Sequence, residues 1–197
     1  MPRLADATKI ERRQQLIDAA RRCVGDRGFQ SLTVDDVCAE AGVSKGAFYV
    51  YFDQKQDLLL ALLDDEAARI EEVMGHLERS HLSGLERLRR FAREMVRLGE
   101  DPARLQIRGD MWAEMSSSPE VRDRWAAVVR ERRDALRGWI EESEASGELA
   151  PIPANALAAI LLALGDGLLL HAGLDPSGFR WVNVGKALDA MFDGIGG

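Results

Sequence analysis

The side chains best suited to chemistry are a lysine and two tyrosines within one short helical pattern. A step of 100° per residue places Gly46, Tyr49 and Val50 on one arc, with Lys45 at its leading edge and Tyr51 on its flank. This arc carries no carboxylate. A cation, a glycine that permits close backbone approach and hydroxyl-tipped rings suit a major groove, which is lined by phosphates and base edges. The pattern therefore predicts contact with duplex nucleic acid.

A helix-turn-helix is the element that would hold these side chains. Thr33 is a good N-cap, and Asp36, three residues later, can bond back to the start of the helix. Gly42 is predicted to end this helix, because glycine most readily adopts the left-handed conformation of a sharp turn. Ser44 can then cap a second helix, which places the motif over about residues 33–53.

The opposite face of the second helix, predicted to run from about residue 44 to 52, is aromatic. Phe48 and Phe52 share an arc and can anchor the helix on a core. Asp53 is predicted to cap the following helix, with Gln56 at its third position. Lys55 lies in that first turn, where it can meet a phosphate beside the exposed N–H groups.

This region is similar in sequence to a known family. Residues 28–41, GFQSLTVDDVCAEA, and residues 42–62, GVSKGAFYVYFDQKQDLLLAL, closely resemble the N-terminal signature of the tetracycline repressor family. The close match covers roughly residues 10–63, and the remainder resembles the family in length and helical pattern. The resemblance implies a homodimeric transcriptional repressor that binds a palindromic operator in double-stranded DNA and is released by a small-molecule effector.

The resemblance also implies which residues contact DNA. The implied phosphate-backbone contacts are Thr33, Ser44, Tyr51 and Lys55, and the implied groove contacts are Lys45, Gly46, Ala47 and Tyr49. Ala47 departs from the threonine often found at its position. Its methyl group can touch only apolar base edges such as the thymine methyl.

The net charge of −7 is distributed unevenly along the 197 residues. Residues 1–58 contain nine Lys or Arg and nine Asp or Glu, whereas the other 139 residues contain 17 basic and 24 acidic ones. The surplus acid therefore lies away from the proposed contact face, where it does not oppose phosphate binding. The two cysteines form no disulfide framework and no hydrophobic N-terminal leader is recognisable, so the expected location is the cytoplasm.

Apolar residues recur at helical spacing throughout, which predicts an all-α protein of about nine helices. A DNA-binding domain over residues 1–58 is expected to precede a ligand-binding and dimerisation domain over 59–197. Residues 154–174 are apolar on nearly every side, but Asp166 and the absence of a basic flank argue against a membrane span. Full burial of such a helix requires a second subunit, so the last two helices are expected to form a four-helix dimer interface.

The expected effector contacts are bulky side chains of the second domain, with charged residues nearby to orient a polar group. They are Phe91, Met95, Met111, Trp112, Met115, Trp125 and His171, with Arg108, Asp110, Asp166 and Arg132, which interrupts an apolar stripe. Catalytic motifs, metal-ligand spacing and cofactor loops are not recognisable, so no enzyme activity, metal or cofactor is expected. Two alternatives are a helical-bundle carrier or enzyme without DNA binding, and a DNA-binding protein without an effector.

Overall fold

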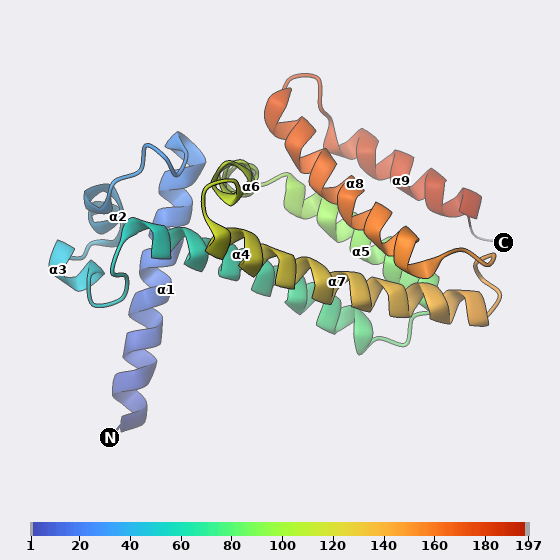
Figure 1. The fold of residues 1–197 in the computed structure, drawn as a ribbon, viewed down its shortest axis with the longest axis horizontal. Coiled ribbons are helices and arrows are strands. Elements are labelled where there is room, and N and C mark those ends of the chain that lie inside the picture. The colour runs from blue at the N-terminus through green and yellow to red at the C-terminus, as the bar shows by residue number, and fades with distance from the viewer. Residues whose placement is uncertain (1, 196–197) are drawn as a thin grey trace.

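A computed structural model describes residues 2–195 of the chain, with side chains for residues 8–25 and 27–194. The described residues form nine α-helices, which confirms the all-α prediction (Figure 1). The helices are α1 (Pro2–Arg27), α2 (Val34–Ala41), α3 (Lys45–Phe48), α4 (Lys55–Glu78), α5 (Gly84–Gly99), α6 (Pro102–Met115), α7 (Pro119–Ala145), α8 (Ala154–Leu174) and α9 (Trp181–Ile195).

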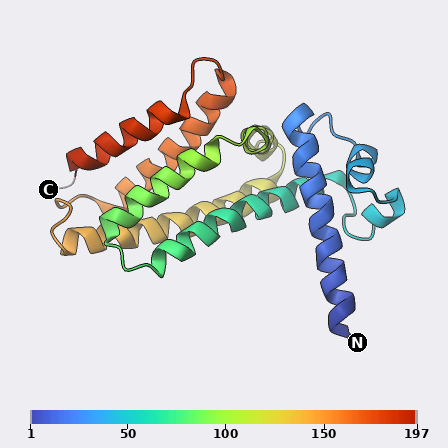
Figure 2. The ribbon, with the colours of Figure 1, turned by 180° about the vertical axis from the view of Figure 1, so that it is seen from behind.

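The helices form two groups that α4 connects. α1, α2 and α3 lie at one end of the molecule, with α3 at its extremity, and α5, α7, α8 and α9 extend toward the other end (Figure 1). From behind, the N-terminal half of α1 is seen to project away from the body of the molecule (Figure 2). The predicted domain boundary after residue 58 falls inside α4, so one continuous helix belongs to both groups.

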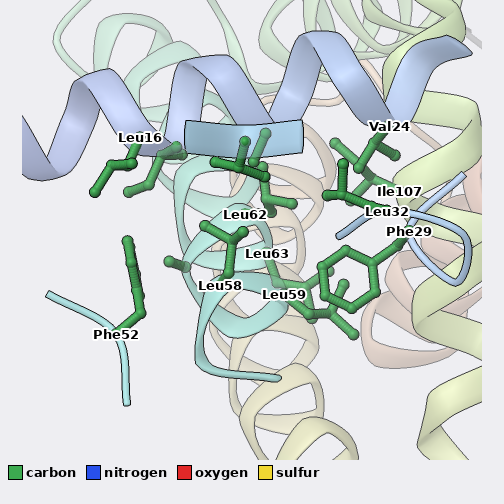
Figure 3. Packing of buried hydrophobic residues seen from close by; sticks show 14 of the residues in the cluster. Leu16, Val24, Phe29, Leu32, Phe52, Leu58, Leu59, Leu62, Leu63 and Ile107 are labelled. Carbon is green, nitrogen blue, oxygen red and sulfur yellow. The ribbon is translucent and has the colours of Figure 1, made fainter. Parts of the chain in front are cut away.

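The core of the first group also contains residues of the second. Leu16, Val24, Leu58 and Leu62 are fully buried between α1 and α4, and Ile107 of α6 packs into the same cluster (Figure 3). The residues that α6 and α7 contribute to this core are Ile107, Met111, Val121, Trp125 and Val128. Because protein interiors are close-packed, α6 cannot shift without disturbing α1.

A second core lies between α4, α5 and α7. Phe91 of α5 and Trp139 of α7 are buried and meet edge to face, with ring centroids 6.2 Å apart. The Trp139 indole N–H donates to the Glu78 carboxylate at 2.5 Å. α5 begins very close to α7, because a Cβ added at Gly84 would overlap the carbonyl oxygen of Trp139 and the Oγ of Ser143.

α8 and α9 leave much of their apolar surface uncovered. By length and composition α8 could cross a membrane, and only 17% of its most apolar window is buried within the chain. Large apolar side chains exposed on these two helices are Ile160, Leu170, Leu174, Val182 and Met191. Exposed apolar surface that is concentrated in this way marks an interaction site.

Replacement of Gly84 by alanine is predicted to destabilise the chain by about 1–3 kcal/mol, because α5 must move away from α7 to admit the methyl group. Gly138→Ala is the matched control, since a Cβ added there, inside α7, meets nothing within 4 Å. It should stabilise the chain by about 0.5–1 kcal/mol, because alanine is the better helix former. Urea unfolding measures both, and equal unfolding free energies would contradict the close packing of α5 on α7.

Candidate nucleic-acid interface and internal cavity

The helix-turn-helix is present, and side-chain caps begin both of its helices. Thr33 Oγ1 accepts a hydrogen bond from the Asp36 N–H at 3.1 Å, and the Asp36 carboxylate accepts one from the Thr33 N–H at 3.0 Å. The bonds from Thr33 lower the pKa of Asp36 below its usual value. Gly42 ends α2 with φ at 65°, and Ser44 Oγ accepts the Ala47 N–H at 3.2 Å to begin α3. These predicted caps and the predicted turn are confirmed.

The segment formed by α3 and the turns after it directs Phe48 and Phe52 inward and Tyr49 outward, as the sequence predicts. Phe48 and Phe52 are 0% and 2% exposed, with ring centroids 5.3 Å apart, whereas Tyr49 and Val50 are 48% and 64% exposed. The α-helical geometry covers only Lys45–Phe48, which is shorter than predicted, because the backbone then tightens into turns with bonds three residues apart.

The next helix begins later than predicted, and the Asp53 cap is wrong. α4 starts at Lys55, so Gln54 occupies the cap position. The Asp57 carboxylate accepts the Gln54 N–H at 3.1 Å. Asp57, rather than Gln56, is therefore the residue that bonds back to the start of the helix.

Both lysines of the predicted contact set already have partners within the chain. Lys45 Nζ lies 3.0 Å from the carboxylate of Asp35, an exposed residue of α2. Lys55 Nζ donates to the Gln30 carbonyl at 3.0 Å and lies 4.7 Å from the centroid of the Phe29 ring, and its partial burial lowers its pKa. Asp35 was not expected at this face, because the arc of α3 contains no carboxylate and the ion pair forms across the turn.

The other predicted contact residues differ in exposure. Thr33, Ser44 and Gly46 are exposed, whereas Ala47 and Tyr51 are half-buried, and Tyr51 packs against the core of the first group. A Cβ added at Gly46 would meet only Ser44 Oγ, at 3.8 Å, so the backbone there is open to close approach. The face therefore combines hydroxyl groups, an accessible backbone, an aromatic ring and a cation.

A cavity lies among α4, α5, α6, α7, α8 and α9. Apolar side chains form most of its wall. Phe91 and Met95 of the predicted effector set line it, together with Leu169 of α8 and Trp181 and Phe192 of α9. Its largely apolar wall suits a small organic ligand.

Five of the predicted effector contacts lie outside this cavity. Met111, Trp112 and Met115 pack in the core of the first group, because their face of α6 is turned away from the cavity. Trp125 is buried beneath a guanidinium group of α6 that lies 3.9 Å from its ring centroid. His171 is exposed on the surface of α8. Of the predicted bulky side chains, only Phe91 and Met95 on α5 therefore face the cavity.

Three arginines and one aspartate give the cavity a charged side; they are Arg104, Arg108, Arg132 and Asp166. Arg108 pairs with Asp166, and Arg104 pairs at 2.7 Å with buried Glu66, which also pairs with Arg21 of α1. Arg104 and Glu66 were not predicted to belong to this charged group. The sequence signal that could have identified them is a charged residue within an apolar helical stripe, as at Arg132. In the part of the chain that the structure describes, no cluster of His, Cys, Asp or Glu is grouped to hold a metal ion.

Asp110 connects α6 to the turn between α1 and α2. Its buried carboxylate accepts the backbone N–H of Phe29 at 2.8 Å and the side-chain amide N–H of Gln106 at 3.4 Å. Asp110 was predicted to orient a ligand, but its carboxylate is directed to this backbone bond instead. α6 therefore contacts the cavity on one side, and α1 and the turn before α2 on the other.

Known proteins resemble the chain over nearly its full length. The HTH-type transcriptional repressor AcnR of Corynebacterium diphtheriae is 26% identical over 196 residues, which cover 99% of this chain and 97% of the relative. A TetR transcription regulator from Haloarcula marismortui superposes with a TM-score of 0.84 at 21% identity, over 95% and 99% of the two chains. A putative regulator from Saccharomonospora viridis in complex with choline gives 0.80 at 22% identity, over 93% and 96%.

Two family models match the chain, one at each end. Residues 16–62 match bacterial regulatory proteins of the tetR family. Residues 84–196, more than half of the chain, match the C-terminal domain of BetI-type transcriptional repressors. The chain therefore belongs to the TetR family, with a BetI-type C-terminal domain, and is a DNA-binding transcriptional repressor rather than an enzyme.

Proposed function

We propose that this protein is a homodimer that binds an inverted-repeat operator and leaves it when a small molecule fills the cavity. The orientation of the segment around α3 carries the proposal. Phe48 and Phe52 are held in the core, so Tyr49 and Val50 are exposed, and α3 lies at one end of the molecule (Figure 1). With Lys45 beside them, these side chains offer a hydroxyl group, apolar contact and a cation to a major groove.

The proposed roles of individual residues follow the predicted set. Phosphate contacts are Thr33, Ser44, Tyr51 and Lys55, and groove contacts are Lys45, Gly46, Ala47 and Tyr49. The two lysines must exchange Asp35 and the Gln30 carbonyl for DNA. The exchange at Lys45 costs little, because exposed ion pairs contribute little to stability.

Two copies are needed because one helix-turn-helix contacts few base pairs. In this proposal α8 and α9 supply the interface, since their exposed apolar side chains require a cover. A second copy of the chain is favoured over lipid as the cover for these side chains, because Asp166 in the middle of α8 forms an ion pair with Arg108. The two-fold axis would set the α3 helices in successive major grooves, about 34 Å apart.

α6 is the proposed connection between the cavity and DNA. Arg104 and Arg108 face the cavity, and Asp110 on the same helix holds the Phe29 N–H in the turn before α2. A ligand that moves α6 would therefore move the helix-turn-helix and change the distance between the two α3 helices. Such a ligand acts only to the extent that it binds the released conformation more tightly.

A small organic effector is supported by the Saccharomonospora viridis protein, which has this fold and is in complex with choline. The expected site of action is the cytoplasm, where a repressor has access to both DNA and metabolites.

Tyr49→Ala is predicted to weaken binding about tenfold to the best duplex recovered from a random pool, because a groove contact is lost. Tyr49→Phe keeps the ring and separates the role of the hydroxyl group. Fluorescence anisotropy at fixed salt measures both variants. Because Tyr49 is 48% exposed, the unfolding midpoint should stay close to that of the parent. Parental affinity in the alanine variant would exclude Tyr49 from the interface.

Asp35→Asn is predicted to raise affinity for all duplexes by about two- to fivefold, because it removes a negative charge from the face and frees Lys45 for phosphate. Glu40→Gln, on the same helix and paired with Arg22, is the matched control and should have a smaller effect. Anisotropy over a series of salt concentrations measures both. A loss of affinity in the Asp35 variant would show instead that the carboxylate itself contacts bases.

Asp110→Ala is predicted to lower the free energy of unfolding by about 1–3 kcal/mol, because the buried Phe29 N–H loses its acceptor. It should also weaken operator binding, since the turn before α2 is no longer fixed to α6. Asp110→Asn retains an acceptor oxygen and should preserve most of both properties. Urea unfolding and anisotropy compare the variants, and parental behaviour in the alanine variant would remove Asp110 from the connection.

A further inference from the structure

Arg132 is a buried cation without a counter-ion. Its neighbours along the apolar stripe of α7, Val128 and Leu136, are also buried, and Arg132 is 5% exposed. Its Nε and Nη2 atoms have no hydrogen-bond partner, and no side chain in the described part of the molecule forms an ion pair with it. Burial of an unpaired charge is strongly unfavourable. No ion pair therefore offsets the cost of burying an arginine at this position.

The carboxylates on this side of the cavity are bound to other cations. Asp166 pairs with Arg108, and Glu66 pairs with Arg104. Burial and the charges of Arg108 and Arg104 lower the pKa of Arg132 to about 9, so its guanidinium remains charged at neutral pH. The site has an excess of positive charge that an incoming anion would offset.

Two guanidinium groups are held beside the cavity by one aromatic ring. The guanidinium carbons of Arg108 and Arg132 lie 3.9 Å and 5.2 Å from the centroid of the Trp125 ring. Both arginines line the cavity, and the rest of its wall is mainly apolar, with Phe91 and Met95 among its members. A single ligand can therefore meet a cationic side and an apolar wall together.

We propose that the effector is an organic anion with an apolar body, whose carboxylate or phosphate pairs with Arg132 while the body lies against the apolar wall. This inference rests on the proposed effector function of the cavity and names the class of its ligand. Arg108 is the second cation within reach of the head group. Because Arg108 belongs to α6 and Arg132 to α7, an anion bound by both would draw α6 toward α7, and α6 carries the bond to the turn before α2.

The test uses the full-length protein and ten-carbon probes that share one apolar chain: decanoate, decyl phosphate, decanol and decyltrimethylammonium. Isothermal titration calorimetry should find at least one of the two anions bound about tenfold or more tightly than decanol, because a buried charge-assisted pair is strong. The cationic probe should bind most weakly. The preference between the anions identifies the head group. Equal binding of decanol and both anions, preference for the cation, or no binding of any probe would overturn the proposal.

Arg132→Gln should reduce the affinity for the favoured anion to that for decanol and leave decanol binding unchanged. Arg137→Gln removes a partly exposed arginine from the same helix and should change neither affinity. Because no carboxylate pairs with buried Arg132, Arg132→Gln and Arg132→Met should keep the parental unfolding midpoint or raise it. A large loss of stability in both variants, or an unchanged anion preference, would mark Arg132 as structural.

Operator release is measured separately by anisotropy with each probe. If an anion binds through Arg132 but does not release DNA, the anion site is supported, and the proposal that a ligand in this cavity releases DNA is refuted. If decanol releases DNA and neither anion binds preferentially, the anion site is refuted, and the proposal that a ligand in this cavity releases DNA is supported.

Discussion

The burial of two phenylalanines four residues apart decides which side chains this repressor exposes at the proposed DNA-contact face. Because Phe48 and Phe52 occupy the core formed with α1 and α4, the intervening Tyr49 and Val50 have no space inside and point outward. A slip of one residue would expose a phenylalanine and bury a tyrosine hydroxyl without a partner, which packing and hydrogen bonding both oppose. The geometry of the contact face therefore depends on the core behind it.

α6 makes the two ends of the molecule mechanically dependent on each other. Ile107 is buried with α1 and α4, and the neighbouring Arg108 lines the cavity. The ion pairs of Glu66 with Arg21 and Arg104 join α1, α4 and α6, so the loss of Glu66 would leave the buried charge of Arg104 without its counter-ion. These three helices are expected to move together. A ligand in the cavity therefore has a physical route to the helix-turn-helix.

Features that depend on residues close in sequence were predictable. The caps at Thr33 and Ser44 depend on atoms three residues away, whereas the pairing of Lys45 with Asp35 depends on how two helices meet. Met111 resembled a ligand contact because two faces of α6 carry buried residues: one face packs against α1 and the other lines the cavity. Helical spacing shows that such a residue is buried but not which neighbour covers it. Asp53 is not the cap because the helix begins one residue later than predicted, with Gln54 at the cap position and the Asp57 carboxylate bonded back to the Gln54 N–H.

The orientation of α3 is best tested by amide hydrogen exchange on the full-length protein, with and without its preferred duplex. Exchange at residues 44–51 and at the start of α2 is predicted to slow when DNA binds, because the face that Tyr49 occupies becomes covered. Exchange in α8, at the other end of the molecule, should not slow by direct contact. Protection confined to other helices, with residues 44–51 exchanging at the free rate, would contradict DNA binding through α3.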